Sequence, residues 1–92
     1  MRSVVFDIET NGLNPDKIWA IHCLDIDTGE EFTFLPETQP LDKDKFIDFS
    51  KTVSLWVGHY CLSFDVPVLH RLIPGCSVDN GDIVDTLVVS RL

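Results

Sequence analysis

The sequence predicts a small α/β protein built on a mixed β-sheet, and three observations favour this fold class. Residues 2–8 and 17–25 are apolar segments with the composition of buried strands. An Asp-Thr-Gly turn at residues 27–29 joins the second segment to a third apolar run. Farther along the chain, helix-like and strand-like segments alternate, so a later strand can pair in parallel with the first.

The first three strands are expected to form an antiparallel meander. Residues 2–8 are rich in Val, Ile and Phe, and the Asn-Gly-Leu-Asn-Pro sequence of residues 11–15 is typical of a turn. Segment 17–25 has apolar residues on both faces, which predicts a central strand. The turn at residues 27–29 then leads into a third strand over residues 31–35.

The middle of the chain predicts a helix followed by a strand. After a loop bounded by two prolines, residues 41–51 suit a short amphipathic helix whose broad apolar face includes Leu41, Phe46 and Phe49. Residues 54–57 are a short apolar run, which predicts the fourth strand. The intervening helix allows this strand to lie parallel to the first.

The last third of the chain predicts a helix, a brief strand and a further helix. Asp65 precedes a helix over residues 66–73, which a Pro-Gly pair ends. Residues 83–84 suit a brief strand. Asp85 is interpreted as the cap of a last helix that starts near Thr86.

The composition fits one small globular domain. The chain has 92 residues, of which 45% are hydrophobic. Its three cysteines lack C-x-x-C spacing, which predicts reduced thiols. No apolar run is long enough for a signal peptide or a membrane span, so we expect a cytoplasmic location and no membrane partner. The net charge of −8 argues against a generic basic nucleic-acid-binding surface but leaves room for phosphate chemistry at a carboxylate–metal site.

Two carboxylates in the first strand form a candidate metal site. Asp7 and Glu9 are two residues apart, which in a strand places them on one face with Cα atoms about 6.5–7 Å apart. Mg²⁺ is commonly held by one or two carboxylates together with substrate phosphate. The alternative is that the strand ends near Asp7 and both acids are solvated.

Asp65 and His59 also allow two interpretations each. Asp65 either caps the helix that follows it or presents its carboxylate to the site formed by Asp7 and Glu9. His59 either touches a substrate or bridges loops. Nothing beyond proximity to Cys61 supports a nucleophilic dyad, and Gly-rich phosphate loops and hydrolase motifs are missing from the sequence.

Three segments together resemble the DEDD (DnaQ-like) superfamily of 3′→5′ exonucleases. Residues 6–13, FDIETNGL, are similar to its first motif, in which a D-x-E pair binds metal. Residues 58–69, GHYCLSFDVPVL, are similar to its second motif, which contains an aromatic–Asp pair. Residues 85–92, DTLVVSRL, are similar to the Asp-Thr-Leu helix that follows. The combination is most similar to the proofreading domain of phage-type family A DNA polymerases.

The resemblance implies a ribonuclease H-like fold that hydrolyses DNA 3′ ends with two Mg²⁺ or Mn²⁺ ions. Asp7 would bridge both metals, Glu9 would bind the metal on the nucleophile side and Asp65 would help hold the second. These three residues are therefore the implied catalytic and metal-binding residues. The implied partners are a single-stranded DNA 3′ end and the other exonuclease and polymerase domains of a parent protein. Substrate contacts are implied for Thr10, Leu13, His59 and Phe64.

Two departures from the family pattern matter. Tyr60 stands where the family usually has Asn, five residues before the second-motif Asp. The third motif, which supplies a fourth carboxylate and a Tyr or His general base, is absent from these 92 residues. We therefore expect residues 1–92 to be a single, partial exonuclease domain with a truncated sheet and weak or no activity alone.

Other functions remain open at this point. A stand-alone DEDD exonuclease acting on RNA or DNA ends would carry the same motifs. A haloacid-dehalogenase-type phosphatase is a third candidate because residues 7–10 approach D-x-D-x-T, although Glu9 replaces the required Asp. A non-catalytic acidic module, used for binding, as a scaffold or as a DNA mimic, is the alternative from a different class.

Overall fold

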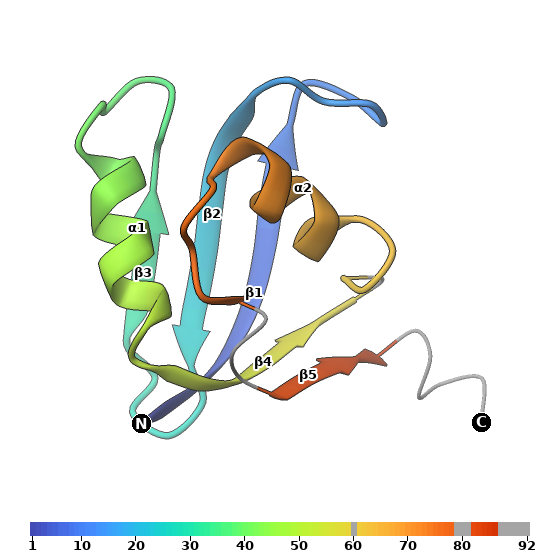
Figure 1. Ribbon diagram of the computed structural model, residues 1–92. Helices are drawn as coiled ribbons and strands as arrows, with labels where there is room; N and C mark the ends of the chain where they lie inside the picture. Colours follow the sequence, from blue (N-terminus) through green and yellow to red (C-terminus); the bar gives the residue numbers. More distant parts are fainter. Residues whose placement is uncertain (60, 79–81, 87–92) are drawn as a thin grey trace.

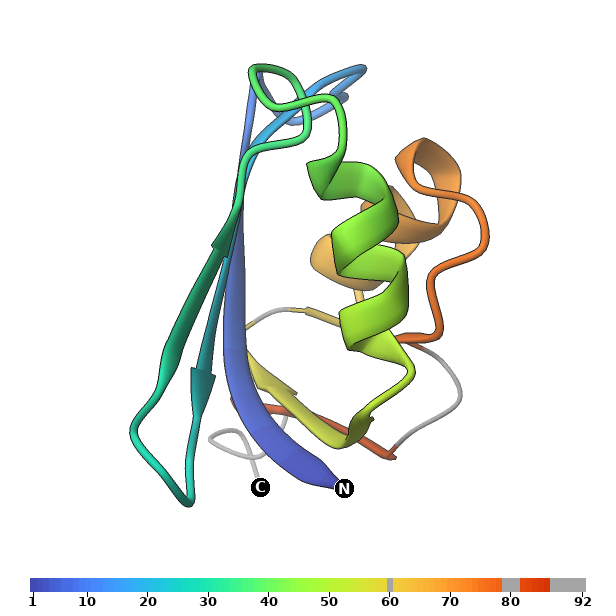
Figure 2. The same ribbon diagram turned by 90° about the vertical axis from the view of Figure 1, so that its left-hand side faces the viewer.

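The computed structural model describes residues 1–59, 61–78 and 82–86, and it shows a mixed sheet covered on one face by two helices (Figures 1 and 2). The strands lie in the order β3-β2-β1-β4-β5. β1, β2 and β3 pair antiparallel, whereas β4 lies parallel to β1 and β5 parallel to β4. The predicted α/β class and the pairing of the first four strands are confirmed. The elements are β1 (Arg2–Thr10), β2 (Ile18–Asp25), β3 (Glu31–Phe34), α1 (Asp42–Ser50), β4 (Val53–Gly58), α2 (Asp65–Leu72) and β5 (Asp82–Asp85).

β1 is the middle strand of the sheet and continues to Thr10, two residues beyond its predicted end. Its pairing with β2 extends past both acids, with Asp7 opposite His22 and Glu9 opposite Ala20. The interpretation in which the strand ends near Asp7 is therefore wrong. The two carboxylates lie within a paired strand, where the pleat fixes their direction.

The core lies between the sheet and the helix layer (Figure 2). Val4, Phe6 and Ile8 of β1 are buried, whereas the residues between them are exposed. The ring of Phe6 meets the fully buried ring of Trp56 of β4 edge to face, with centroids 5.3 Å apart. This alternation leaves Asp7 and Glu9 directed away from the packed core.

The helix boundaries correct two predictions. Leu41 is the N-cap residue of α1 and 69% exposed, so it is not part of the apolar face that buries Phe46 and Phe49. α2 begins at Asp65 itself, after Phe64 as its N-cap residue, so the capping interpretation of Asp65 is wrong. A cap must lie outside the helical turn, with extended backbone, to accept its N–H groups.

Several predictions concern the end of the chain. β5 includes the predicted residues 83–84, and Asp85 is its last residue. The helix predicted to start near Thr86 lies outside the described residues, except for Thr86 itself. Tyr60 also lies outside them.

All three cysteine side chains are buried. In the part of the chain that the structure describes, the helices are too short and too polar to cross a membrane.

Candidate active site

Five of the seven predicted site residues line one pocket of about 280 Å³. They come from three parts of the fold: strand β1, the turn that follows it, and the loop and first helical residue after β4. The pocket is lined by Asp7, Ile8, Leu13, His59, Phe64 and Asp65.

The parallel pairing of β4 with β1 explains why these segments meet. Carboxyl ends of parallel strands lie at the same edge of a sheet. The described pairing between the two strands runs from Arg2 to Val5 on β1, so β4 ends beside the middle of β1 while β1 continues to Thr10. The chain that follows β4 therefore passes beside the second half of β1, and α2 begins there (Figure 1).

Gly58 makes the turn out of β4 possible. A Cβ atom at this position would lie 2.8 Å from the Cβ of Cys61 and 3.0 Å from a ring carbon of Phe6. Both distances are shorter than ordinary carbon contacts. The chain can therefore fold back over the strand end only because residue 58 has no side chain.

Asp65 is a buried carboxyl, 6% exposed, in a negatively charged setting. Burial first, and the charge of Asp7 second, raise its pKa from the ordinary value of 3.8 to about 6. The backbone N–H of Ile8 acts in the opposite direction, and the charge of Asp85 adds a smaller increase. A positive charge placed between Asp7 and Asp65 would relieve this repulsion.

Asp85 does not line the pocket, but its charge acts on both Asp65 and Cys61. Its side chain is buried, and its Oδ2 accepts a hydrogen bond from the backbone N–H of Leu62 at 3.0 Å. Burial, with the charges of Asp85 and Asp65 as smaller causes, raises the pKa of Cys61 to about 11. That thiol is protonated at neutral pH, which argues against a nucleophilic role beside His59.

Glu9 and Thr10, the other two predicted residues, do not line the pocket. The side chain of Glu9 is 64% exposed, and its Oε1 lies 3.8 Å from Nε2 of His22 on the neighbouring strand. The hydroxyl of Thr10 donates to the carbonyl of Gly12 at 2.9 Å and so stabilises the turn after β1. Their roles in metal and substrate binding remain predictions.

The residues present offer a divalent ion a pair of carboxylates. Among the described residues, no three His, Cys, Asp or Glu side chains are grouped closely enough to hold a metal ion together. Asp7 and Asp65, in contrast, share a pocket and a mutual repulsion. Two carboxylates with room for a phosphate are a donor set that Mg²⁺ accepts.

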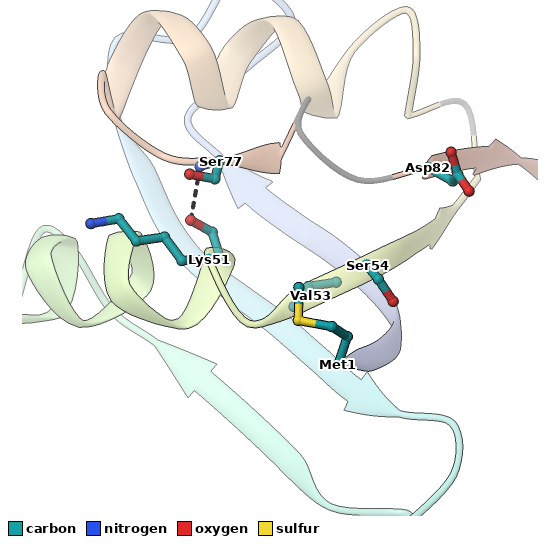
Figure 3. A pocket seen from close by; sticks show the side chains of 7 residues that line it. Met1, Lys51, Val53, Ser54, Ser77 and Asp82 are labelled. Carbon is teal, nitrogen blue, oxygen red and sulfur yellow. Dashed lines mark hydrogen bonds between the residues drawn. The ribbon is translucent and has the colours of Figure 1, made fainter.

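A second hollow of about 300 Å³ lies at the other end of the sheet, where β4 begins (Figure 3). Its walls include Lys51, Ser77 and Asp82. Ser50 beneath it is buried and already engaged, because its hydroxyl donates to the carbonyl of Ile47 and accepts the backbone N–H of Ser77. The bond between Ser77 and Ser50 links the segment after α2 to α1, and this hollow does not include Asp7 or Asp65.

Sequence reasoning missed two contributors to the site, the buried carboxylate of Asp85 and the backbone N–H of Ile8. The sequence did carry a signal for Asp85, the Asp-Thr pair directly after an apolar run, but this pair was interpreted as a helix cap. The Ile8 N–H has no sequence signal of its own, because it acts through the backbone of a strand.

The model of the RNase_H superfamily matches residues 4–91. No curated protein sequence compared with the chain matches it. Among solved structures, the family B DNA polymerase from the hyperthermophilic archaeon Pyrobaculum calidifontis is similar, with a TM-score of 0.76 and 20% sequence identity. The match covers 99% of this chain and 16% of the polymerase chain, and at this identity it shows a common fold alone.

Proposed function

The chain belongs to the RNase_H superfamily, and from this premise we propose that it carries part of a 3′→5′ exonuclease site that proofreads DNA 3′ ends within a DNA polymerase. Family membership confirms the predicted ribonuclease H-like fold class, and it agrees with an exonuclease-like domain. The reaction, its direction and its substrate are the proposal.

The observation that carries the proposal is the pocket shared by Asp7 and Asp65. Its described lining holds two carboxylates and no Lys or Arg side chain. A phosphodiester is itself an anion, so it can approach this pocket only if a cation lies between it and the acids. A carboxylate pair that needs a cation and lines a pocket large enough for a phosphate is what metal-assisted phosphoryl chemistry requires.

The chain's own residues have distinct tasks in this proposal. Asp7 and Asp65 hold a divalent ion, Mg²⁺ or Mn²⁺, which supplies Lewis-acid polarisation of the phosphate and lowers the pKa of a bound water. Leu13, which is 95% exposed at the rim, and Phe64 offer apolar surface against which a terminal base packs. His59 lines the same pocket, with its Nδ1 3.0 Å from Oγ1 of Thr86.

A complete site of this family has further groups. The family resemblance implies a fourth carboxylate and a general base, and neither is supplied by these 92 residues. We propose that other parts of a polymerase supply them, together with basic contacts to DNA. Weak or absent hydrolysis by the 92 residues alone is the expected result.

Metal binding tests the proposal independently of turnover. The wild-type chain should bind Mn²⁺ in a calorimetric titration, and Asp7→Asn should weaken the affinity at least about tenfold because half of the donor set is lost. Asp48→Asn, which removes one exposed carboxylate on α1, is the charge-matched control and should leave the affinity nearly unchanged. Digestion of labelled single-stranded DNA with Mn²⁺ measures any residual activity.

A different outcome would favour the non-catalytic alternative. If the wild-type chain binds no Mn²⁺, or if Asp7→Asn and Asp48→Asn behave alike, the pocket is not a metal site. An acidic binding or scaffold module would then be the better account. Robust Asp7-dependent DNA degradation would instead overturn the expectation that the 92 residues are insufficient.

A further inference from the structure

The loop that presents Asp65 is held by the end of β5. This loop connects β4 with α2, and the structure describes His59 and residues 61–64 of it. The last two residues of β5 and Thr86, which follows it, each contact a different loop residue. The backbone N–H of Leu62 donates to Oδ2 of Asp85 at 3.0 Å, the thiol of Cys61 donates to the carbonyl of Val84 at 3.8 Å, and Nδ1 of His59 lies 3.0 Å from Oγ1 of Thr86.

The strand register explains why these contacts coincide. β5 lies parallel to β4, and Asp85 is paired with Gly58, the last residue of β4. The loop therefore starts directly beside Asp85. Because Cys61 packs against Gly58, the chain folds back over the strand end and returns the Leu62 N–H toward Asp85.

The loop also contacts the first turn of the helix that carries Asp65. The carbonyl of Cys61 accepts the backbone N–H of Val66, the second residue of α2, at 2.8 Å. Phe64, the N-cap residue, makes no side-chain capping bond. The start of α2 consequently depends on the backbone position of residues 61–62 and not on a conventional cap.

Asp85 is well placed to act as the anchor. Its side chain is 3% exposed, and a buried carboxylate needs hydrogen bonds to offset its lost hydration. A backbone N–H that donates to a carboxylate forms a stronger bond than one that donates to a neutral oxygen. The bond to Leu62 is thus the strongest of the three contacts at this end of β5.

We propose that Asp85 is a positioning residue for the candidate active site: by accepting the Leu62 N–H, it fixes the loop so that the carboxylate of Asp65 lies beside that of Asp7. The importance of this arrangement for metal binding rests on the proposed function. The anchoring of the loop by Asp85 does not depend on the proposed function, and it can be measured separately.

Amide hydrogen exchange of the 92-residue chain, followed by NMR, reports on the loop. In the wild type the Leu62 amide should be protected. Asp85→Ala should speed its exchange about tenfold or more, because the acceptor is lost. Asp85→Asn keeps an acceptor oxygen and should restore most of the protection. Asp82→Ala is the matched control, since Asp82 is exposed at the start of the same strand and lines the other hollow (Figure 3).

Mn²⁺ titration of the same four proteins tests the consequence for Asp65. Asp85→Ala should weaken the affinity about tenfold relative to Asp82→Ala, with Asp85→Asn between them. An unprotected Leu62 amide in the wild type would overturn the proposal, even if Asp85→Ala fails to fold. Equal exchange in Asp85→Ala and Asp82→Ala, or loop opening without loss of affinity, would overturn it too. A protected, Asp85-dependent loop in a wild type that binds no Mn²⁺ would support the anchoring and refute the proposed function instead.

Discussion

The carboxyls of Asp7 and Asp65 line one pocket, and the charge of Asp7 raises the pKa of Asp65. One lies within the middle strand of the sheet and the other is the first residue of α2. Two like charges held close together by the fold repel each other. The pair is therefore unfavourable for folding at neutral pH unless a cation lies between them.

Asp65→Asn should stabilise the metal-free chain at pH 7. Ionisation of the buried Asp65 carboxyl costs about 1.4 kcal/mol for each unit by which folding raises its pKa, and the amide removes that cost. We expect the free energy of unfolding in urea to rise by about 1–3 kcal/mol. Asp48→Asn should change it by less than about 0.5 kcal/mol. A destabilised Asp65→Asn protein would contradict this account.

The raised pKa of Asp65 should also make the free energy of unfolding depend on pH. The pKa of Asp65 is about 6 in the folded chain against an ordinary value of 3.8, so its protonated form favours the folded state. This contribution is fully present below about pH 3.8 and is lost as the pH rises through about 6. The wild type should thus lose stability relative to Asp65→Asn between about pH 4 and 7. Urea unfolding of both proteins at several pH values measures the difference, and a gap that closes toward neutral pH would have the wrong sign.

Gly58→Ala should destabilise the fold and disturb the loop before α2. The new methyl would meet the Cβ of Cys61 at 2.8 Å and the ring of Phe6 at 3.0 Å, and both neighbours are buried. Overpacking of this kind costs about 1–3 kcal/mol. Thermal unfolding measures the loss of stability. Cys61→Ala retains the clashing Cβ, so the double variant Gly58→Ala/Cys61→Ala should not regain the lost stability. A regain of stability would contradict the clash with the Cβ of Cys61.

Leu13→Ala should leave stability unchanged and weaken DNA binding. Leu13 is 95% exposed beside the carboxylates, so its side chain contributes little to the fold. Loss of apolar surface at the rim should lower the affinity for a short single-stranded DNA in the presence of Mn²⁺ by about threefold to tenfold. Leu41→Ala, exposed on α1, is the matched control. Fluorescence anisotropy with labelled DNA measures the affinity of both variants, and an equal loss of affinity in Leu13→Ala and Leu41→Ala would contradict the role of Leu13.

Short-range patterns in the sequence were sufficient for much of the fold. Val, Ile and Phe in residues 2–8, the Asp-Thr-Gly turn and the alternation of helix and strand predicted the meander and the parallel β4. Leu41 shows where such patterns fail. Helical periodicity placed it on the apolar face, but the structure uses it as the N-cap residue, so it lies outside the packed helix.

The candidate site was predictable as a set of residue types and less so as a geometry. The i, i+2 spacing placed Asp7 and Glu9 on one face, but it could not show that Glu9 lies near His22 while Asp65 lies beside Asp7. Both relationships depend on neighbouring strands and on the turn at Gly58. The contact of Asp85 with Leu62 depends on the register of β5 with β4, which no local pattern in the sequence encodes.

The central claim is that Asp7 and Asp65 together form one metal site, and Mn²⁺ titration followed by NMR line broadening tests it most directly. Paramagnetic broadening should be strongest at the amides of Ile8, Phe64 and Asp65, which flank the pocket, and in Asp7→Asn it should require at least about tenfold more Mn²⁺. Broadening centred on the acidic first turn of α1, or broadening at the pocket that needs no more Mn²⁺ in Asp7→Asn than in the wild type, would contradict the claim.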